Sequence, residues 1–162
     1  MDINIKTATV EDVKTISQLI SMSCLTNITL PPQDQTDIWY KWVTGLDTIN
    51  KRLETSNCIT LIATHKTKPI GTGYINLGDE RAYIGGLYIH PDYQQQGVGY
   101  KILKHLTSLT TDKHKIVEAE ISHENIPSKK LFTKAGFQYS GELPSRFFNP
   151  SIWELWTLQL NN

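Results

Sequence analysis

The sequence predicts an α+β fold of three layers, in which a mixed, mostly antiparallel sheet of about seven strands is flanked by four helices. Seven segments have the alternation or the β-branched composition of strands, and four others repeat apolar residues at helical spacing. Three of the strands follow one another with only turns between them, which indicates antiparallel hairpins. The length of 162 residues is close to the commonest size of one domain, so we expect residues 1–162 to share one core.

The N-terminal part of the chain predicts one strand and two helices. Residues 2–7 alternate as a strand does, and residues 9–20 combine a threonine cap, an acidic first turn and apolar side chains at helical spacing. A proline pair excludes regular helix from residues 27–35. A second helical pattern covers residues 38–53, and we expect it to break near Gly45.

Three consecutive strands are predicted over residues 59–64, 70–77 and 82–89, because β-branched and apolar stretches there are separated by turn-like residues. The glycine pair Gly85-Gly86 interrupts the third strand. Glycines inside a strand are typical of a bulge, or of a place where another backbone or a ligand comes close.

The C-terminal part of the chain alternates between helices and strands. Helical spacing covers residues 97–111 and 128–135, and Gly136 is placed to end the second of these helices in a left-handed conformation. Strand patterns cover residues 116–121, 137–143 and 152–160.

Composition limits the classes of function. Sixteen basic and sixteen acidic residues cancel without forming blocks of like charge, which disfavours binding to nucleic acid. The chain starts without the pattern of a signal peptide, and no stretch is apolar over the ~18 residues of a membrane span, so we expect a cytoplasmic protein that binds no membrane. Cys24 and Cys58 indicate buried thiols, and five histidines without metal-ligand spacing predict no metal site.

The segment from Ile89 to Tyr100 carries the first candidate site. It has the pattern of a strand end, a glycine-containing turn and the start of a helix. The backbone amides of residues 95–99 would converge at the helix N-terminus, which favours a phosphate or pyrophosphate. The segment lacks the ending of a Walker loop and the third glycine of a dinucleotide fingerprint. A plain loop-to-helix turn is the alternative.

Two carboxylates form the second candidate site. Glu118 and Glu120 share one face of the strand predicted over residues 116–121, where a covered sheet should be apolar. Burial and mutual repulsion would raise at least one of their pKa values toward the range of a general base, and we expect Glu118 to tune Glu120 in this way. A solvated sheet edge is the alternative.

Four motifs follow one another in the order found in one known family. Gln94, Gly97 and Gly99 carry a turn pattern of Gln or Arg, two variable residues, Gly, one variable residue, and Gly or Ala. The other three are the opening residues 5–13, the hairpin at residues 70–73, and a block with Asn125, Ser128, Leu131-Phe132 and Gly136-Phe137. On these motifs the chain resembles the GNAT superfamily of acyl-coenzyme A dependent N-acetyltransferases, as a single domain over residues 1–162.

The resemblance implies acetyl-CoA as acyl donor, with a strand that offers backbone groups to the pantetheine arm and a turn that holds the pyrophosphate. For Ser128, a surface hydroxyl is an equal alternative. The implied donor-binding residues are Leu87, Tyr88, Ile89, Gln94, Gln95, Gln96, Gly97, Val98, Gly99, Tyr100, Asn125, Ser128 and Phe132.

The resemblance also implies direct attack of an amine on the thioester. Glu120 lies five residues before Asn125, where some members of the family use a glutamate as general base through a water. The tyrosine that often protonates the leaving thiolate is replaced by Phe132, which we expect to pack against the donor. Tyr83, Tyr88 and Tyr139 are the substitutes considered, and packing is the alternative for each.

The acceptor is expected to be a primary amine of a small molecule or peptide, and the protein a monomer or homodimer. Its pocket would draw on residues 26–35 and 144–151 and on Trp39 and Trp42, with Asp34 and Asp37 for an ammonium or Arg146 for a carboxylate. Surface charge is the alternative for those three. A non-catalytic acyl-CoA binding or sensor module on the same fold is the second hypothesis, and a generic nucleotide-binding protein the third.

Overall fold

The structure, a computed structural model, describes residues 1–27, 40–144 and 152–160. Seven strands form one mixed sheet in the order β1-β2-β3-β4-β5-β7-β6, in which the β4/β5 neighbours are parallel and all others antiparallel. The strands are β1 Asn4–Thr7, β2 Cys58–His65, β3 Lys68–Leu77, β4 Arg81–Ile89, β5 Ile116–Ser122, β6 Gln138–Pro144 and β7 Ile152–Gln159.

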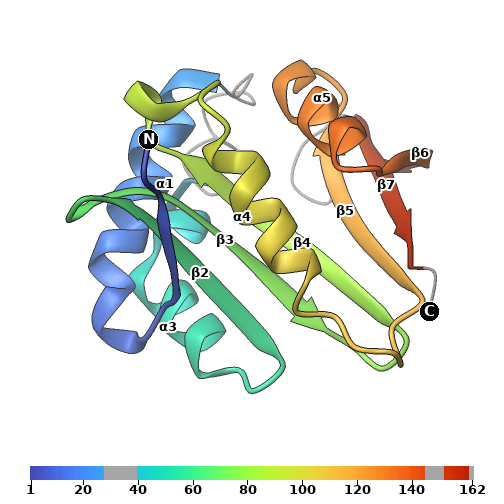
Figure 1. The fold of residues 1–162 in the computed structure, drawn as a ribbon, viewed down its shortest axis with the longest axis horizontal. Coiled ribbons are helices and arrows are strands. Elements are labelled where there is room, and N and C mark those ends of the chain that lie inside the picture. The colour runs from blue at the N-terminus through green and yellow to red at the C-terminus, as the bar shows by residue number, and fades with distance from the viewer. Residues whose placement is uncertain (28–39, 145–151, 161–162) are drawn as a thin grey trace.

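Helices cover both faces of this sheet (Figure 1), which confirms the predicted fold class. Helices α1 and α3 pack on strands β2 to β4 from one side, and α4 packs on the same strands from the other. Residues 40–44 are helical and α3 starts after Gly45, so the predicted break is confirmed. The helices are η1 Val10–Asp12, α1 Val13–Asn27, α3 Leu46–Glu54, η2 Pro91–Tyr93, α4 Val98–Thr107 and α5 Ile126–Lys134.

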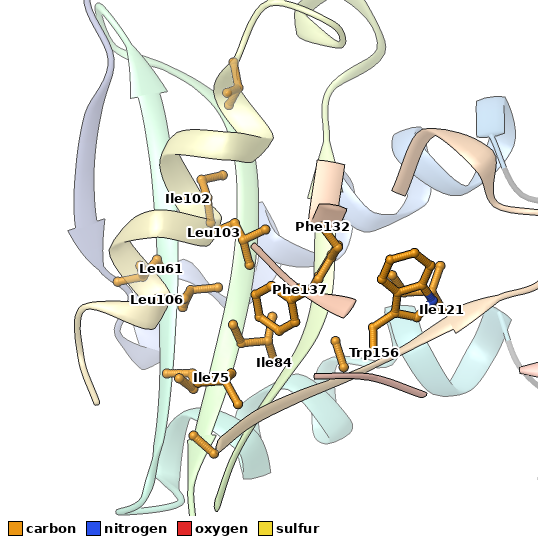
Figure 2. Close-up of a cluster of buried hydrophobic side chains, with 14 of the residues drawn as sticks. Leu61, Ile75, Ile84, Ile102, Leu103, Leu106, Ile121, Phe132, Phe137 and Trp156 are labelled. Carbon is orange, nitrogen blue, oxygen red and sulfur yellow. The ribbon is translucent and has the colours of Figure 1, made fainter. Parts of the chain in front are cut away.

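The larger hydrophobic core lies between the sheet and helices α4 and α5 (Figure 2). The apolar stripe of α4 supplies Ile102, Leu103 and Leu106, which are fully buried because helical spacing points all three at the sheet. Phe132 of α5 packs into the same cluster. This packing fixes where both helices begin relative to the sheet.

The predicted glycine features have the expected geometry. A register shift between Thr72 and Tyr74 marks a bulge opposite Gly85-Gly86, and Gly86 has a φ of +58°. Gly136 follows α5 with a φ of +95°, so the predicted left-handed stop is confirmed.

Both cysteines are free thiols. Cys24 is buried as predicted, and burial raises its pKa to about 12. Cys58 is only partly buried, which corrects the expectation for this residue. Within the described residues, no helix is both long and apolar enough to cross a membrane.

Candidate functional site

An opening between the two parallel strands is the main feature of the sheet. β4 and β5 pair from Arg81 with Ile116 to Ile84 with Ala119, and the described pairing stops there although both strands continue. Figure 1 shows the two strands diverging toward the end where α4 and α5 begin. The rest of β4, which contains Leu87, Tyr88 and Ile89, therefore presents a strand edge inside the sheet, where an extended ligand could hydrogen-bond.

The turn after β4 leads directly into this opening. The Gln94 side-chain amide donates to the Ile89 carbonyl oxygen at 3.1 Å, which ties the turn to the end of the strand. Gln95 and Gly97 both have left-handed backbones, with φ of +56° and +84°. The Gln96 side-chain amide donates to the Asp92 carbonyl oxygen at 2.7 Å.

The first turn of α4 directs unused donors toward solvent. The Lys101 N–H is the first that reaches a helical carbonyl, that of Gly97 at 3.1 Å, so the N–H groups of Val98, Gly99 and Tyr100 have no partner within the helix. A Cβ added at Gly97 would meet no atom within 4 Å. The space beside Gly97, at the start of these amides, is therefore open, and free amides at a helix start favour an anion such as a pyrophosphate.

Helix α5 lies against the same turn. A Cβ at Gly99 would come within 3.1 Å of Leu131, and the Lys134 ammonium lies 5.1 Å from the centroid of the Tyr100 ring. The Asn125 side-chain oxygen accepts from the Ser128 N–H at 3.2 Å and caps α5. The C-terminal half of α5, with Leu131 and Lys134, thus lies beside the first turn of α4.

The Phe132 ring was expected to pack against the donor, but the structure places it in the hydrophobic core. Its side chain is 5% exposed and meets Phe137 edge to face, with ring centroids 4.9 Å apart. It is therefore a core residue of the structure, because its position on α5 faces the sheet.

The two carboxylates lie on one half-buried face of β5, as predicted. Glu118, however, accepts from the Arg81 guanidinium and forms an ion pair with it. The sequence alone did not predict this ion pair, and the role expected of Glu118 beside Glu120 stays a prediction. Glu120 lies beyond the last pair of β4 and β5, beside the opening.

A phenol that the sequence did not single out, that of Tyr74, lies on the Glu120 face of the sheet. Tyr74 pairs with Gly85, and its ring covers the glycine pair so closely that a Cβ at Gly85 would come within 2.4 Å of the Tyr74 hydroxyl. The Arg52 guanidinium lies over the other side of this ring, 4.2 Å from the centroid. The only sign of this contact in the sequence was the glycine pair Gly85-Gly86. It predicted that some group comes close to the strand, but it did not identify Tyr74.

The tyrosines considered as proton donors are dispersed. Tyr83 of β4 pairs in register with Glu118 of β5. Tyr88 packs on the cluster beneath α1, and burial raises the pKa of its phenol far above the ordinary value. Tyr139 is exposed on β6 and meets Trp156 with ring centroids 6.3 Å apart, on the opposite face from Glu120.

Part of the expected acceptor pocket lies outside the described residues. Asp34, Asp37, Trp39 and Arg146 belong to that part. Trp42 lies on the helical segment of residues 40–44 and is 46% exposed.

A buried carboxylate ties β7 to the helix that borders the opening. Glu154 is 5% exposed and accepts from Lys129 at 2.9 Å, from His123 at 2.8 Å and from the Trp156 indole at 2.9 Å. Burial raises the pKa of its carboxyl, but the hydrogen bonds from Lys129, Trp156 and His123 outweigh burial and lower the pKa below its ordinary value.

We expect Glu154→Gln to lower the free energy of unfolding by about 2 kcal/mol at pH 7, because charge-assisted bonds are lost. A lowered pKa in the folded state means that this stabilisation is complete above the unfolded pKa of ~4.3 and disappears as the pH falls through the folded value. In urea unfolding, the difference between the two proteins should therefore be complete at pH 7 and should shrink as the pH is lowered below about 4.3. Glu124→Gln, an exposed carboxyl in the turn before α5, is the matched control. Equal stability of Glu154→Gln and the parent at pH 7 would contradict the prediction.

The family model described as the acetyltransferase (GNAT) family matches residues 20–137. The chain is 35% identical over 82 residues to the L-amino acid N-acyltransferase MnaT of Escherichia coli, which is 45% of this chain and 47% of that protein. It is 33% identical, over the same shares, to an L-methionine sulfoximine/L-methionine sulfone acetyltransferase of Salmonella typhimurium. The chain spans about half the length of the curated relatives it matches.

Solved structures share the fold over the whole chain. The PaiA N-acetyltransferase of Thermoplasma acidophilum, in complex with coenzyme A, has a TM-score of 0.86 at 16% identity and covers 99% of this chain and 100% of its own. The ribosomal-protein-S18-alanine N-acetyltransferase of E. coli has a TM-score of 0.76 at 15% identity, covering 99% and 96%. The chain belongs to the GNAT acetyltransferase family.

Proposed function

We propose that this protein transfers an acetyl group from acetyl-CoA to a primary amine of a small molecule or peptide. The observation that carries the proposal is the opening between β4 and β5, with the turn of residues 94–100 and its free helix amides at one end and Glu120 beside it. Membership of the GNAT family and the coenzyme A in the Thermoplasma structure support the donor. The names of the two bacterial relatives support an amine acceptor of amino-acid type.

The donor would lie along the free edge of β4. Backbone groups of Leu87, Tyr88 and Ile89 would pair with the amide groups of the pantetheine arm, as an added strand does. The amides from Gln95 to Tyr100 would hold the pyrophosphate. Asn125 and Ser128 would line the other side, at the start of α5.

The reaction would need one base. The neutral amine attacks the acyl carbon, and the carbon–sulfur bond breaks after the carbon–nitrogen bond has formed. The proton that leaves the nitrogen passes through a water to the Glu120 carboxylate, which is half-buried beside the opening. The thiolate takes its proton from solvent, since a thiol with a pKa near ~8.5 is a tolerable leaving group.

Release of free CoA thiol tests the proposal. The protein would be mixed with acetyl-CoA and a panel of small amines, and thiol release would be followed together with the mass of the acetylated product. We expect acceptor-dependent release and a product heavier by one acetyl group. Binding of acetyl-CoA with no release for any amine would instead favour a non-catalytic acyl-CoA sensor, the alternative suggested by the phenylalanine at position 132.

A further inference from the structure

One cation on the Glu120 face of the sheet has no acidic partner. Arg52, in the last turn of α3, is partly buried and forms no ion pair with any carboxylate of the described residues. Its guanidinium carbon lies over the Tyr74 ring, 4.2 Å from the ring centroid. A cation–π contact of this kind fixes the direction of the guanidinium while leaving its N–H donors available.

The strand register places Tyr74, which lies under Arg52, on the same face of the sheet as Glu120. Tyr74 pairs with Gly85, and Tyr83 pairs with Glu118, so Tyr74, Gly85 and Glu120 point to one face of the sheet in adjacent strands. Gly85 has no side chain, and the Tyr74 hydroxyl therefore extends over it toward β5. The Tyr74 ring therefore lies between the guanidinium and the glycine pair, on the same face of the sheet as Glu120.

The charges agree with this arrangement. Burial raises the pKa of the Tyr74 phenol, the Arg52 charge lowers it, and the Cys58 and Glu120 charges raise it. The phenol thus feels a cation from one side and an anion from the other. It stays protonated at neutral pH, and its hydroxyl has no hydrogen-bond partner among the described residues.

We propose that Arg52, held on the Tyr74 ring, binds a carboxylate of the acceptor, so that the acceptor is an amino acid or a similar molecule with a carboxylate close to its amine. This inference rests on the proposed function, since it assigns the second end of the acceptor site at Glu120. The guanidinium fork matches the two oxygens of a carboxylate at about 2.8 Å. At the last β4–β5 pair, Ile84 with Ala119, strands β3 and β5 are two strand spacings apart, roughly 10 Å. Glu120 follows directly after this pair, and a carboxylate, an adjacent amine and one water would fill the space.

Matched pairs of acceptors test the inference. L-leucine and 3-methylbutylamine, like L-phenylalanine and 2-phenylethylamine, differ only in the carboxylate. We expect the parent protein to prefer the amino acid of each pair in kcat/KM. Arg52→Gln should lower kcat/KM for the amino acid by about 10²-fold, mainly through KM, and change it for the amine by less than about 3-fold.

Variants separate recognition from structure. Arg52→Lys keeps the charge and should retain part of the preference, whereas Lys51→Gln removes an exposed charge from the same turn of α3 and should retain all of it. Tyr74→Phe keeps the ring under Arg52 and should also keep the preference. Folding of each variant would be checked by circular dichroism.

The outcomes distinguish this inference from the proposed function. Equal loss for both members of a pair in Arg52→Gln, or an unchanged preference in both Arg52 variants, would overturn the carboxylate assignment while amine acetylation stands. The assignment is also wrong if only amines without a carboxylate are acetylated. If neither the amino acids nor the matched amines are acetylated, the proposed function itself is wrong.

Discussion

Glu120→Gln should lower kcat by about 10²-fold or more near neutral pH, while the affinity for acetyl-CoA changes by less than about 2-fold. Glutamine has the shape of glutamate but cannot accept the proton of the attacking amine. Glu120 is half-buried beside the end of the β4–β5 pairing. It is not part of the turn before α4 that would hold the pyrophosphate. Donor binding should therefore be insensitive to the change. Kinetics across the pH range and titration with acetyl-CoA are the two measurements.

Glu118→Gln is the matched control for this prediction. It lies on the same strand and the same face, but its carboxylate is paired with Arg81. We expect less than about 5-fold loss of kcat, since a paired charge is not the proton acceptor. A Glu120→Gln protein as active as the parent at every pH, or an equal loss in both variants, would remove Glu120 from its assigned role.

Gly97→Val should weaken acetyl-CoA binding by more than about 10²-fold. Gly97 has a φ of +84°, a left-handed conformation that costs a β-branched residue about 1–2 kcal/mol. The Cβ would also enter the open space in front of the first α4 amides. A ligand that approaches the backbone there would be blocked, and relief of the strain would turn the amides away. Isothermal titration with acetyl-CoA measures the loss.

Gly141→Val controls for backbone strain. Gly141 on β6 has a φ of +145°, and a Cβ there would also meet no atom within 4 Å. Both variants should lose stability to urea, but only Gly97→Val should lose donor affinity. Unimpaired titration of a folded Gly97→Val protein would mean that the phosphates bind elsewhere.

The secondary structure could be predicted from the sequence because periodicity and turn residues are local properties. The break at Gly45 and the stop at Gly136 both depend on neighbouring residues, and both were predicted. The strand pattern of residues 116–121 likewise predicted that Glu118 and Glu120 share a face.

The site depends on partners from distant parts of the chain, and there the prediction from sequence was incomplete. Arg81 neutralises Glu118 from 37 residues away, and nothing local to either residue signals the pair. Gly85-Gly86 predicted a close approach, but only the hairpin register reveals that Tyr74 is the residue that approaches. Helical spacing at Phe132 could not decide between a ring that faces the core and one that faces a ligand, because both are apolar surroundings.

Hydrogen–deuterium exchange with and without acetyl-CoA tests most directly whether the β4–β5 opening binds the donor. Within residues 85–89, the amides that face the opening and not β3 should exchange more slowly when acetyl-CoA is present, since they would pair with the pantetheine arm. The amides of residues 95–100 should also be protected, since they would hold the pyrophosphate. The β2 strand, whose amides pair with β1 and β3, should exchange at the same rate in both samples. Saturating acetyl-CoA that leaves residues 85–89 and 95–100 unprotected would contradict the account.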